Sequence, residues 1–131
     1  MSVAELLRWQ WQSYHRFHRS RANLLVHIVA VPLFLAADIA LLVALLRLSW
    51  LAAALSLVVI FASIGLQGAG HRKEPNPPEP FTSPLNAFLR IVLEQWVTFP
   101  RFVLSGGWLT ALRAPSTTPS TPGGPARQEG D

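Results

Sequence analysis

The sequence predicts an all-α membrane protein: an antiparallel transmembrane helical hairpin flanked by amphipathic or interfacial helices. Two observations lead to this fold class. Half of the 131 residues are hydrophobic and only 14% are charged, whereas a soluble domain carries about 25% charged residues. The apolar residues are also concentrated in two long runs in the middle of the chain. A buried soluble hairpin is the alternative, but too little polar chain remains to cover two such helices.

The first 22 residues predict an N-terminal amphipathic helix, best defined over residues 3–19. One stripe at helical spacing is largely apolar and aromatic: Leu7, Trp11, Tyr14 and His18. His15 falls on the neighbouring arginine-bearing stripe, so it is expected to face solvent, whereas His18 is expected to point toward the protein or the membrane. Tyr14 and the tryptophans are typical of an interfacial aromatic belt.

Residues 23–71 predict the hairpin, with spans at about 24–46 and 49–70 and Asn23 as the N-cap of the first span. Residues 48–70 contain no Asp, Glu, Lys or Arg. At about 1.5 Å per residue such a helix is about 34 Å long, and the hydrocarbon core of a bilayer is about 30 Å thick. The very short link between the two runs requires antiparallel helices.

Asp38 is the one acidic residue of the first span. An intramembrane carboxylate suggests a functional role by default. Here we expect it to be protonated and hydrogen-bonded to a serine of the second span, such as Ser56, and we leave it out of the site.

The basic residues predict the orientation of the hairpin. Only Arg47 of the 11 Lys and Arg residues lies in the hairpin turn, so the positive-inside tendency places both termini in the cytoplasm. Residues 1–22 are polar and basic rather than a signal peptide. The predominance of arginine over lysine favours a bacterial protein and hence the inner membrane, with the endoplasmic reticulum as the eukaryotic equivalent. No nucleic-acid-binding motif is present, so no nucleic acid is expected as a partner.

Residues 72–113 predict a proline-rich loop followed by a third helix. Ser83 caps this helix and Pro84 lies in its first turn, and the helix is expected to run to about Phe99, where Pro100 interrupts it. It is too polar and too short for a span, so an interfacial or re-entrant helix is expected. Residues 114–131 are rich in Pro, Ser, Thr and Gly and predict a disordered tail.

Three histidines are expected to converge at the cytoplasmic interface. His27 lies one turn into the first span, His71 ends the second, and His18 precedes the first; the start and the end of an antiparallel hairpin share one membrane face. Neutral imidazole is the commonest metal ligand in proteins. The chain has no cysteine, so nitrogen and oxygen are its only means of holding a metal. The competing interpretation of each histidine alone is an ordinary interfacial side chain.

Two carboxylates lie within reach of these histidines. Glu74 follows His71 by three residues, and Glu94 lies on the third helix. Three histidines and a carboxylate with open positions suit Fe(II) or Zn(II). Glu74 and Glu94 are therefore the candidate catalytic residues, although Glu74 can equally be a solvated loop charge and Glu94 a partner of Arg90. Asn23 and Gln67 are the candidates for hydrogen-bonding the metal ligands.

The residues around the hairpin resemble the yeast-type 2-hydroxy fatty acid dioxygenase family over roughly residues 9–110. The pattern consists of Tyr14-x3-His18-x4-Asn23-x3-His27-x4-Pro32, then Gln67-x2-Gly70-His71-x2-Glu74, then Pro78 and the Phe-Pro-x-Phe stretch at 99–102. The resemblance implies an Fe(II)-dependent membrane enzyme that shortens 2-hydroxy fatty acids by one carbon with dioxygen. It also implies that His18, His27 and His71 are iron ligands.

The expected substrate is an amphiphilic acid with its tail between the spans. Arg21, Arg72 and Lys73 are candidates to attract its carboxylate at the interface. Two other functions stay open: a haem-binding hairpin with His27 and His71 as axial ligands, and a non-enzymatic membrane protein that binds a partner or anionic lipid. Self-association also stays open.

Overall fold

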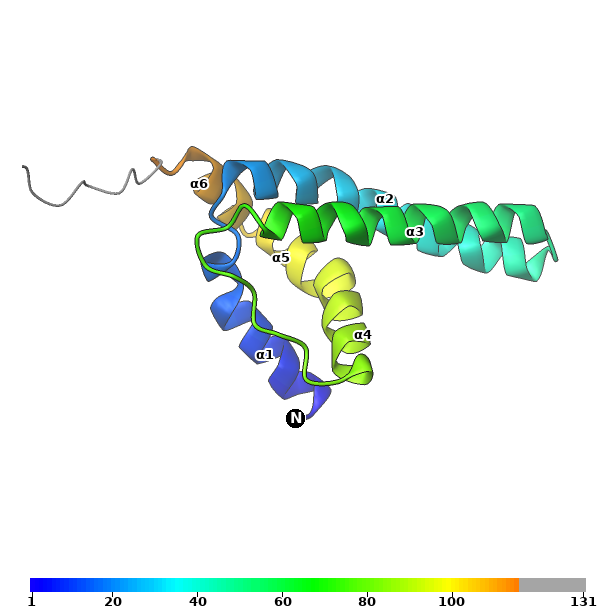
Figure 1. Cartoon of the computed structure of the whole chain (residues 1–131), viewed down its shortest axis with the longest axis horizontal. Coiled ribbons are helices and arrows are strands. Elements are labelled where there is room, and N and C mark those ends of the chain that lie inside the picture. Colours follow the sequence, from blue (N-terminus) through cyan, green and yellow to red (C-terminus); the bar gives the residue numbers. More distant parts are fainter. Residues whose placement is uncertain (116–131) are drawn as a thin grey trace, which may run out of the picture.

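The computed structural model describes residues 1–115, and within them the regular structure is entirely helical, which confirms the all-α class. The elements are α1 (Val3–Ser13), the 3₁₀ turn η1 (Tyr14–Arg16), α2 (Arg21–Leu46), α3 (Trp50–His71), α4 (Pro84–Leu93), the π-helical segment η2 (Glu94–Thr98), α5 (Phe99–Leu104) and α6 (Gly107–Arg113). Helices α2 and α3 form a long antiparallel hairpin, and the shorter helices gather at its open end (Figure 1). Most of the predicted tail, 114–131, lies outside the described residues.

Small residues line the contact between α2 and α3. Ala30, Ala37 and Ala44 recur every seven residues on α2, and Ser56, Ser63 and Gly70 do the same on α3; all six are buried. Side chains of this size allow two helix backbones to approach closely, as is typical of helix contacts within membranes. The hairpin is therefore held by close packing along one seam.

The outer faces of the hairpin carry large apolar side chains with no protein partner. Leu42, Val58 and Phe61 are each more than 60% exposed. Both helices are long and apolar enough to span a membrane, with mean hydropathies of 2.6 and 2.0, yet only 28% of each apolar window is buried. A core helix of a soluble protein would be mostly buried. An exposed apolar surface of this extent is consistent with contact with lipid.

Replacing Gly70 with alanine should destabilise the hairpin. A Cβ at this position would lie 2.5 Å from Asn23 Oδ1 and 3.4 Å from Val26 Cβ, and overpacking of this kind costs about 1–3 kcal/mol. Thermal unfolding in detergent measures the effect. The matched control is Gly65→Ala on the same helix, where nothing lies within 4 Å of the new Cβ. Equal melting temperatures for the two variants would contradict the assigned packing.

The N-terminal helix is shorter than the 3–19 that the periodicity predicts. Helix α1 begins with a capping box, in which Ser2 and Glu5 bond each other's backbone N–H groups, and it ends at Ser13. After Ser13 the chain tightens into the 3₁₀ turn, in which the Tyr14 carbonyl accepts the Phe17 N–H at 3.1 Å. His18 Nδ1 donates to the same carbonyl at 3.0 Å. The chain turns, and the His18 side chain is directed inward.

The prediction that Asn23 caps the first span is wrong. Helix α2 begins at Arg21 with Ser20 at the N-cap position, and Asn23 lies inside its first turn. The Asn23 side chain is fully buried and donates to Phe17 O at 3.2 Å and to Glu74 Oε1 at 2.7 Å. It joins three segments of the chain where a cap would bond only its own helix.

The third helix begins as predicted, because Ser83 accepts the Asn86 N–H and Pro84 occupies the first turn. It does not stop at Pro100. The segment Glu94–Thr98 is π-helical, and the Phe99 N–H donates to Glu94 O five residues back. This wider turn leads directly into α5, and Pro100 lies at its start, where a missing N–H is tolerated. The helical path therefore continues to Leu104.

The main hydrophobic core lies where the open end of the hairpin meets the short helices. Its buried members are Tyr14, Leu24, Val31, Phe99 and Phe102. Trp108 of α6 packs against this core, and its indole N–H donates to Leu24 O at 3.0 Å. Tyr14 is only 5% exposed, so it belongs to this core and not to an interfacial aromatic belt.

The structure also corrects the expected partner of Asp38. Ser56 donates to Ala52 O within its own helix, whereas Asp38 Oδ2 accepts the indole N–H of Trp96 at 3.0 Å. Trp96 belongs to η2, so this carboxylate connects the hairpin to the π-helical segment. The sequence offered no sign of the pairing because the residues lie 58 positions apart.

Candidate metal centre

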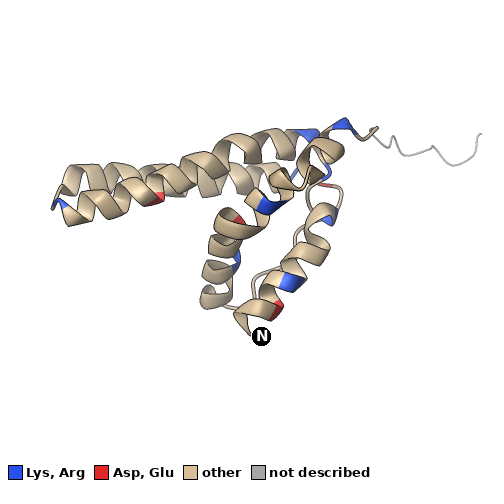
Figure 2. Ribbon diagram, turned by 180° about the vertical axis from the view of Figure 1, so that it is seen from behind, with Lys and Arg blue, Asp and Glu red and all other residues tan. Residues whose placement is uncertain are grey.

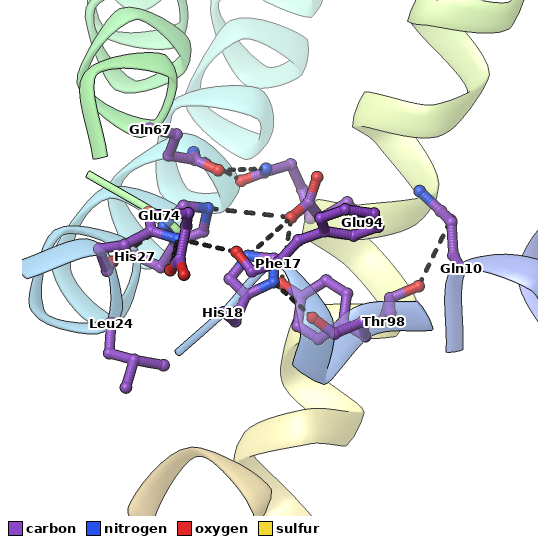
Figure 3. Close-up of polar contacts among 12 residues, drawn as sticks. Gln10, Phe17, His18, Leu24, His27, Gln67, Glu74, Glu94 and Thr98 are labelled. Carbon is purple, nitrogen blue, oxygen red and sulfur yellow. Dashed lines mark hydrogen bonds and ion pairs between the residues drawn. The ribbon is translucent and has the colours of Figure 1, made fainter. Parts of the chain in front are cut away.

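Three imidazoles and one carboxylate meet at the open end of the hairpin. Figure 3 shows two of the imidazoles, His18 and His27, beside the carboxylate of Glu94. We call His18, His27, His71 and Glu94 the His–Glu cluster. His18 follows the 3₁₀ turn, His27 lies on α2, His71 ends α3, and Glu94 opens η2. The ring centroids of the three imidazoles are 4.8–4.9 Å apart in every pair, with steep interplanar angles of 78–90°. The structure thus brings together the three histidines that the sequence placed at one membrane face.

Backbone carbonyls fix the tautomers of two of these rings. His18 Nδ1 lies 3.0 Å from Tyr14 O, and His27 Nδ1 lies 3.0 Å from Asn23 O. A carbonyl only accepts hydrogen bonds, so Nδ1 must carry the proton in both rings. The neutral ring then presents Nε2 as a bare lone pair. Metal-binding histidines are typically held in this way, with the other ring nitrogen donating to a carbonyl or carboxylate.

Three ring nitrogens of the cluster have no hydrogen-bond partner among the described residues. This holds for Nε2 of His18, Nε2 of His27 and Nδ1 of His71, all of which are buried. A buried polar atom without a partner costs about 1–3 kcal/mol. The potential ligand atoms of the cluster lie within 4.8 Å of one another, and two nitrogens on one ion are at most about 4.2 Å apart. The side chains therefore need to close in by only about 0.6 Å to hold a divalent metal ion.

Glu94 supplies negative charge to the cluster. Its Oε1 lies 3.4 Å from His18 Nε2 and 3.8 Å from His27 Nε2. Burial raises the pKa of Glu94, whereas a hydrogen bond from His18 and the positive charge that the three imidazoles carry when protonated lower it, to about 2. A positive charge at this place, on the rings or on a metal ion that they hold in their neutral form, therefore favours the ionised carboxylate. The alternative partner Arg90 donates elsewhere, to Glu79 O and Pro80 O.

Glu74 lies outside the cluster and has a different set of partners. Its carboxylate accepts the backbone N–H groups of Arg19 and Ser20 at 3.0–3.1 Å, in addition to the Asn23 amide. These donors stand at the N-terminal end of α2, where a carboxylate is favourable. Glu74 therefore fastens the loop after α3 to the start of α2, and its geometry is that of a structural residue.

Replacing Glu74 with glutamine should lower the stability and leave metal binding intact. Glutamine keeps one acceptor oxygen but loses the charge that strengthens these bonds, a loss of about 1–3 kcal/mol. The measurements are thermal unfolding and metal content, with Glu79→Gln as the control because Glu79 is exposed. Loss of metal at unchanged stability would instead assign Glu74 to the metal centre.

A buried amide pair lies beside the cluster. Gln67 Nε2 donates to Gln95 Oε1 at 3.0 Å, and Gln95 Nε2 donates back to Gln67 Oε1 at 2.7 Å. Gln67 was expected to support a metal ligand directly. It instead joins α3 to η2, directly beside Glu94, and Asn23 supports His27 through its backbone carbonyl rather than its side chain.

Two cavities reach the cluster from different sides. The α4 cavity, about 380 Å³, reaches His18, His71 and Glu94 and has apolar walls that include Phe17, Ile64 and Ile91. The α6 cavity, about 1190 Å³, lies against α6 and reaches His18. Of the three expected carboxylate-binding residues, Arg72 lines the α4 cavity, whereas Arg21 and Lys73 line the α6 cavity. The Arg21 guanidinium also donates to Leu112 O and Ala114 O.

The arrangement does not suit a haem. Axial nitrogens lie about 2 Å from the iron on opposite faces of the ring, so the centroids of two axial imidazoles are roughly 6 Å or more apart. The His27 and His71 centroids are 4.8 Å apart, and the third imidazole stands equally close to both. No macrocycle fits between them.

Tyr14 contacts the cluster and was not singled out as a site residue from the sequence. Its hydroxyl donates to Glu94 Oε1 at 3.1 Å. Burial, reinforced by the negative charge of Glu94, raises the pKa of Tyr14 well above its ordinary value. The sequence shows that Tyr14 and His18 share a helix face, because they are four residues apart. It gives no sign of the contact between Tyr14 and Glu94, which are 80 residues apart.

One comparison with known proteins gives a match. The family model described as Mpo1-like, 2-hydroxy-palmitic acid dioxygenase Mpo1-like, matches residues 4–103. This range covers more than half of the chain and contains all four members of the His–Glu cluster. Neither the curated proteins nor the solved structures give a match.

Proposed function

The chain belongs to the Mpo1-like 2-hydroxy-palmitic acid dioxygenase family, and from that premise we propose that it is a membrane-embedded, Fe(II)-dependent enzyme that shortens 2-hydroxy fatty acids by one carbon. The observation that carries the proposal is the His–Glu cluster. Within residues 1–115, three buried imidazole nitrogens of this cluster have no hydrogen-bond partner, and the Glu94 carboxylate lies beside them. A cation bound among them would satisfy all three.

Iron is proposed over zinc because the family's reaction consumes dioxygen. Zinc has no redox chemistry, whereas three nitrogens and a carboxylate with open positions suit Fe(II). When bound, the iron would supply the redox chemistry that activates dioxygen. His18, His27 and His71 would hold it. In His18 and His27, the hydrogen bond from Nδ1 to a backbone carbonyl fixes the orientation of the ring.

The proposed reaction balances without a co-substrate. R–CH(OH)–COOH and O2 give R–COOH, CO2 and H2O, with cleavage of the bond between C1 and C2. The acid gives up four electrons and dioxygen accepts four, so 2-oxoglutarate is not required. In metabolism this step would follow a reaction that hydroxylates a fatty acid at C2, or a reaction that releases a 2-hydroxy acid.

The α4 cavity is the proposed site for the lipid acid. Its volume of about 380 Å³ lies within the range of about 300–1,000 Å³ that is common for small-molecule sites. Apolar walls suit the part of the acyl chain next to the reacting carbons. Arg72 lines this cavity next to His71, so it is our first candidate for the substrate carboxylate, ahead of Arg21 and Lys73.

We assign the catalytic carboxylate to Glu94 alone. As an anion it would balance the charge of a bound metal ion, and its carboxylate would be the acceptor for the 2-hydroxyl group of a bound substrate. Glu74 already accepts bonds from two backbone N–H groups and one amide, so it has no comparable role.

We further propose that both termini face the cytoplasm. In the part of the chain that the structure describes, Lys and Arg gather at the open end of the hairpin, and only Arg47 stands at its tip (Figure 2). This asymmetry follows the positive-inside tendency. In this proposed orientation the His–Glu cluster lies at the cytoplasmic surface of the membrane.

The test is turnover by detergent-purified protein reconstituted with Fe(II) under argon. Addition of air and 2-hydroxypalmitate labelled with ¹³C at C1 should give pentadecanoate and labelled CO2 in equal amounts, with one O2 consumed for each. Palmitate, which lacks the 2-hydroxyl group, should give no product. A folded protein with one bound iron and no pentadecanoate would refute the proposed reaction.

The non-enzymatic alternative makes opposite predictions in the same preparation. A membrane adaptor that binds a partner or anionic lipid through its basic end needs no stoichiometric metal. It should also retain its binding when His71 is replaced with alanine. The unpartnered nitrogens of the His–Glu cluster favour the enzyme, because an adaptor gives no reason to bury them together.

A further inference from the structure

Tyr14 makes three separate contacts with the His–Glu cluster. Its carbonyl accepts the Nδ1–H of His18 at 3.0 Å, its ring stacks on the His18 ring with centroids 3.9 Å apart and an interplanar angle of 18°, and its hydroxyl donates to Glu94 Oε1 at 3.1 Å. We propose that Tyr14 is a positioning residue that sets the arrangement of His18 and Glu94 for metal binding. This inference rests on the metal centre of the proposed function.

The contacts with His18 fix the orientation of that imidazole. The carbonyl bond holds one edge of the ring, and the stacked phenol covers one face. Tyr14 is itself held by the core, since Phe102 packs edge-on at 5.1 Å and only 5% of Tyr14 is exposed. The His18 ring therefore has little freedom to turn its Nε2 away from His27 and His71.

The contact with Glu94 fixes the carboxylate. The oxygen that accepts the Tyr14 hydroxyl is the same Oε1 that lies 3.4 Å from His18 Nε2 and 3.8 Å from His27 Nε2. Glu94 belongs to the π-helical segment η2, whereas the three histidines lie on other segments of the chain. The hydroxyl thus links the 3₁₀ turn after α1 to Glu94, the member of the cluster that comes last in the sequence.

Loss of this link should weaken metal binding without removing a ligand. Hydrogen bonds that orient metal-binding groups typically contribute 10–100-fold to metal affinity. Tyr14→Phe removes the hydroxyl and keeps the stacked ring and the backbone carbonyl, so the fold should remain. We expect about a tenfold weaker affinity for Co(II), a spectroscopic substitute for Fe(II), with one ion still bound per chain.

The experiment uses the full chain in detergent and reads both the Co(II) affinity and the visible Co(II) absorption, which responds to the ligand arrangement. The matched control is Thr98→Val, which removes a buried hydroxyl from the π-helical segment that also carries Glu94. Among the described residues, Thr98 Oγ1 bonds Gln10 alone. Tyr14→Phe should shift the absorption bands, whereas Thr98→Val should leave them in place. A merely structural role of Tyr14 would lower the melting temperature and leave the bands unchanged, which would overturn the inference.

A double-mutant cycle decides whether the hydroxyl acts through Glu94. In the Glu94→Ala background, Tyr14→Phe should change the Co(II) affinity by less than about twofold. An equal loss in both backgrounds would overturn the inference. The cycle measures Co(II) binding and not turnover. If it gives the expected result and the oxygenase assay yields no product, only the proposed reaction is refuted. Absence of Co(II) binding by the unmodified chain would refute both.

Discussion

Replacement of His27 with alanine should abolish both iron binding and turnover. His27 is fully buried, its Nδ1 is occupied by Asn23 O, and its Nε2 points to the other members of the cluster. Loss of a partner that only orients a ligand already costs about 10–100-fold, so loss of the ligand itself should cost more than about 100-fold in both properties. Metal analysis and pentadecanoate formation are the two measurements.

His15→Ala is the matched control for this variant. His15 lies three residues before His18 in the sequence, but it is exposed to solvent, as its place on the arginine-bearing stripe predicted. It should retain full iron content and activity. If His27→Ala were to keep one iron per chain, the assignment of His27 as a ligand would be wrong, whatever its activity.

Binding of the metal should stabilise the fold by several kcal/mol. The cluster joins the chain after α1 to α2, α3 and η2, so a ligand that binds only the folded state holds these segments together. At a free metal concentration 1,000 times Kd, the linkage relation gives about 4.1 kcal/mol. Thermal unfolding under argon, with increasing Fe(II), should therefore show a rising melting temperature that chelator reverses.

The specificity of this stabilisation is checked with His27→Ala. That variant should melt at one temperature irrespective of added Fe(II). A rise in the variant equal to that of the unmodified chain would mean that iron binds elsewhere and would contradict the assigned centre.

The hairpin and the meeting of the three histidines were within reach of sequence reasoning for physical reasons. Long apolar runs have few alternatives to membrane-length helices, and a very short link leaves two such helices antiparallel. The end of one helix and the start of the next are then neighbours. His27 and His71 follow from that topology with no knowledge of side-chain packing.

The features that were missed depend on contacts between distant segments. The bond from Tyr14 to Glu94 and the bond from Trp96 to Asp38 each connect residues more than 50 positions apart. Glu74 was expected at the reaction site because it follows His71 closely, but its carboxylate turns to the N–H groups before α2. No local pattern distinguishes these alternatives, because each side chain has several chemically reasonable partners.

The π-helical segment was missed for a related reason. Pro100 is ordinarily a sign that a helix has ended, and only the surrounding contacts show that the chain continues through a wider turn. Gln95 and Thr98 face the interior from this segment and are each 2% exposed. Their burial depends on how η2 packs against α1, α2 and α3, which is a property of the whole fold.

The wider turn makes the length of this segment a constraint in its own right. A π-turn accommodates one residue more than an α-turn, and one residue corresponds to a rotation of about 100° about the helix axis. Deleting a single residue between Glu94 and Thr98 would put Glu94 and the aromatic pair Phe99 and Phe102 out of phase. Either the carboxylate or the aromatic pair would then turn away from the interior. The number of residues in this segment is therefore expected to matter as much as their identity.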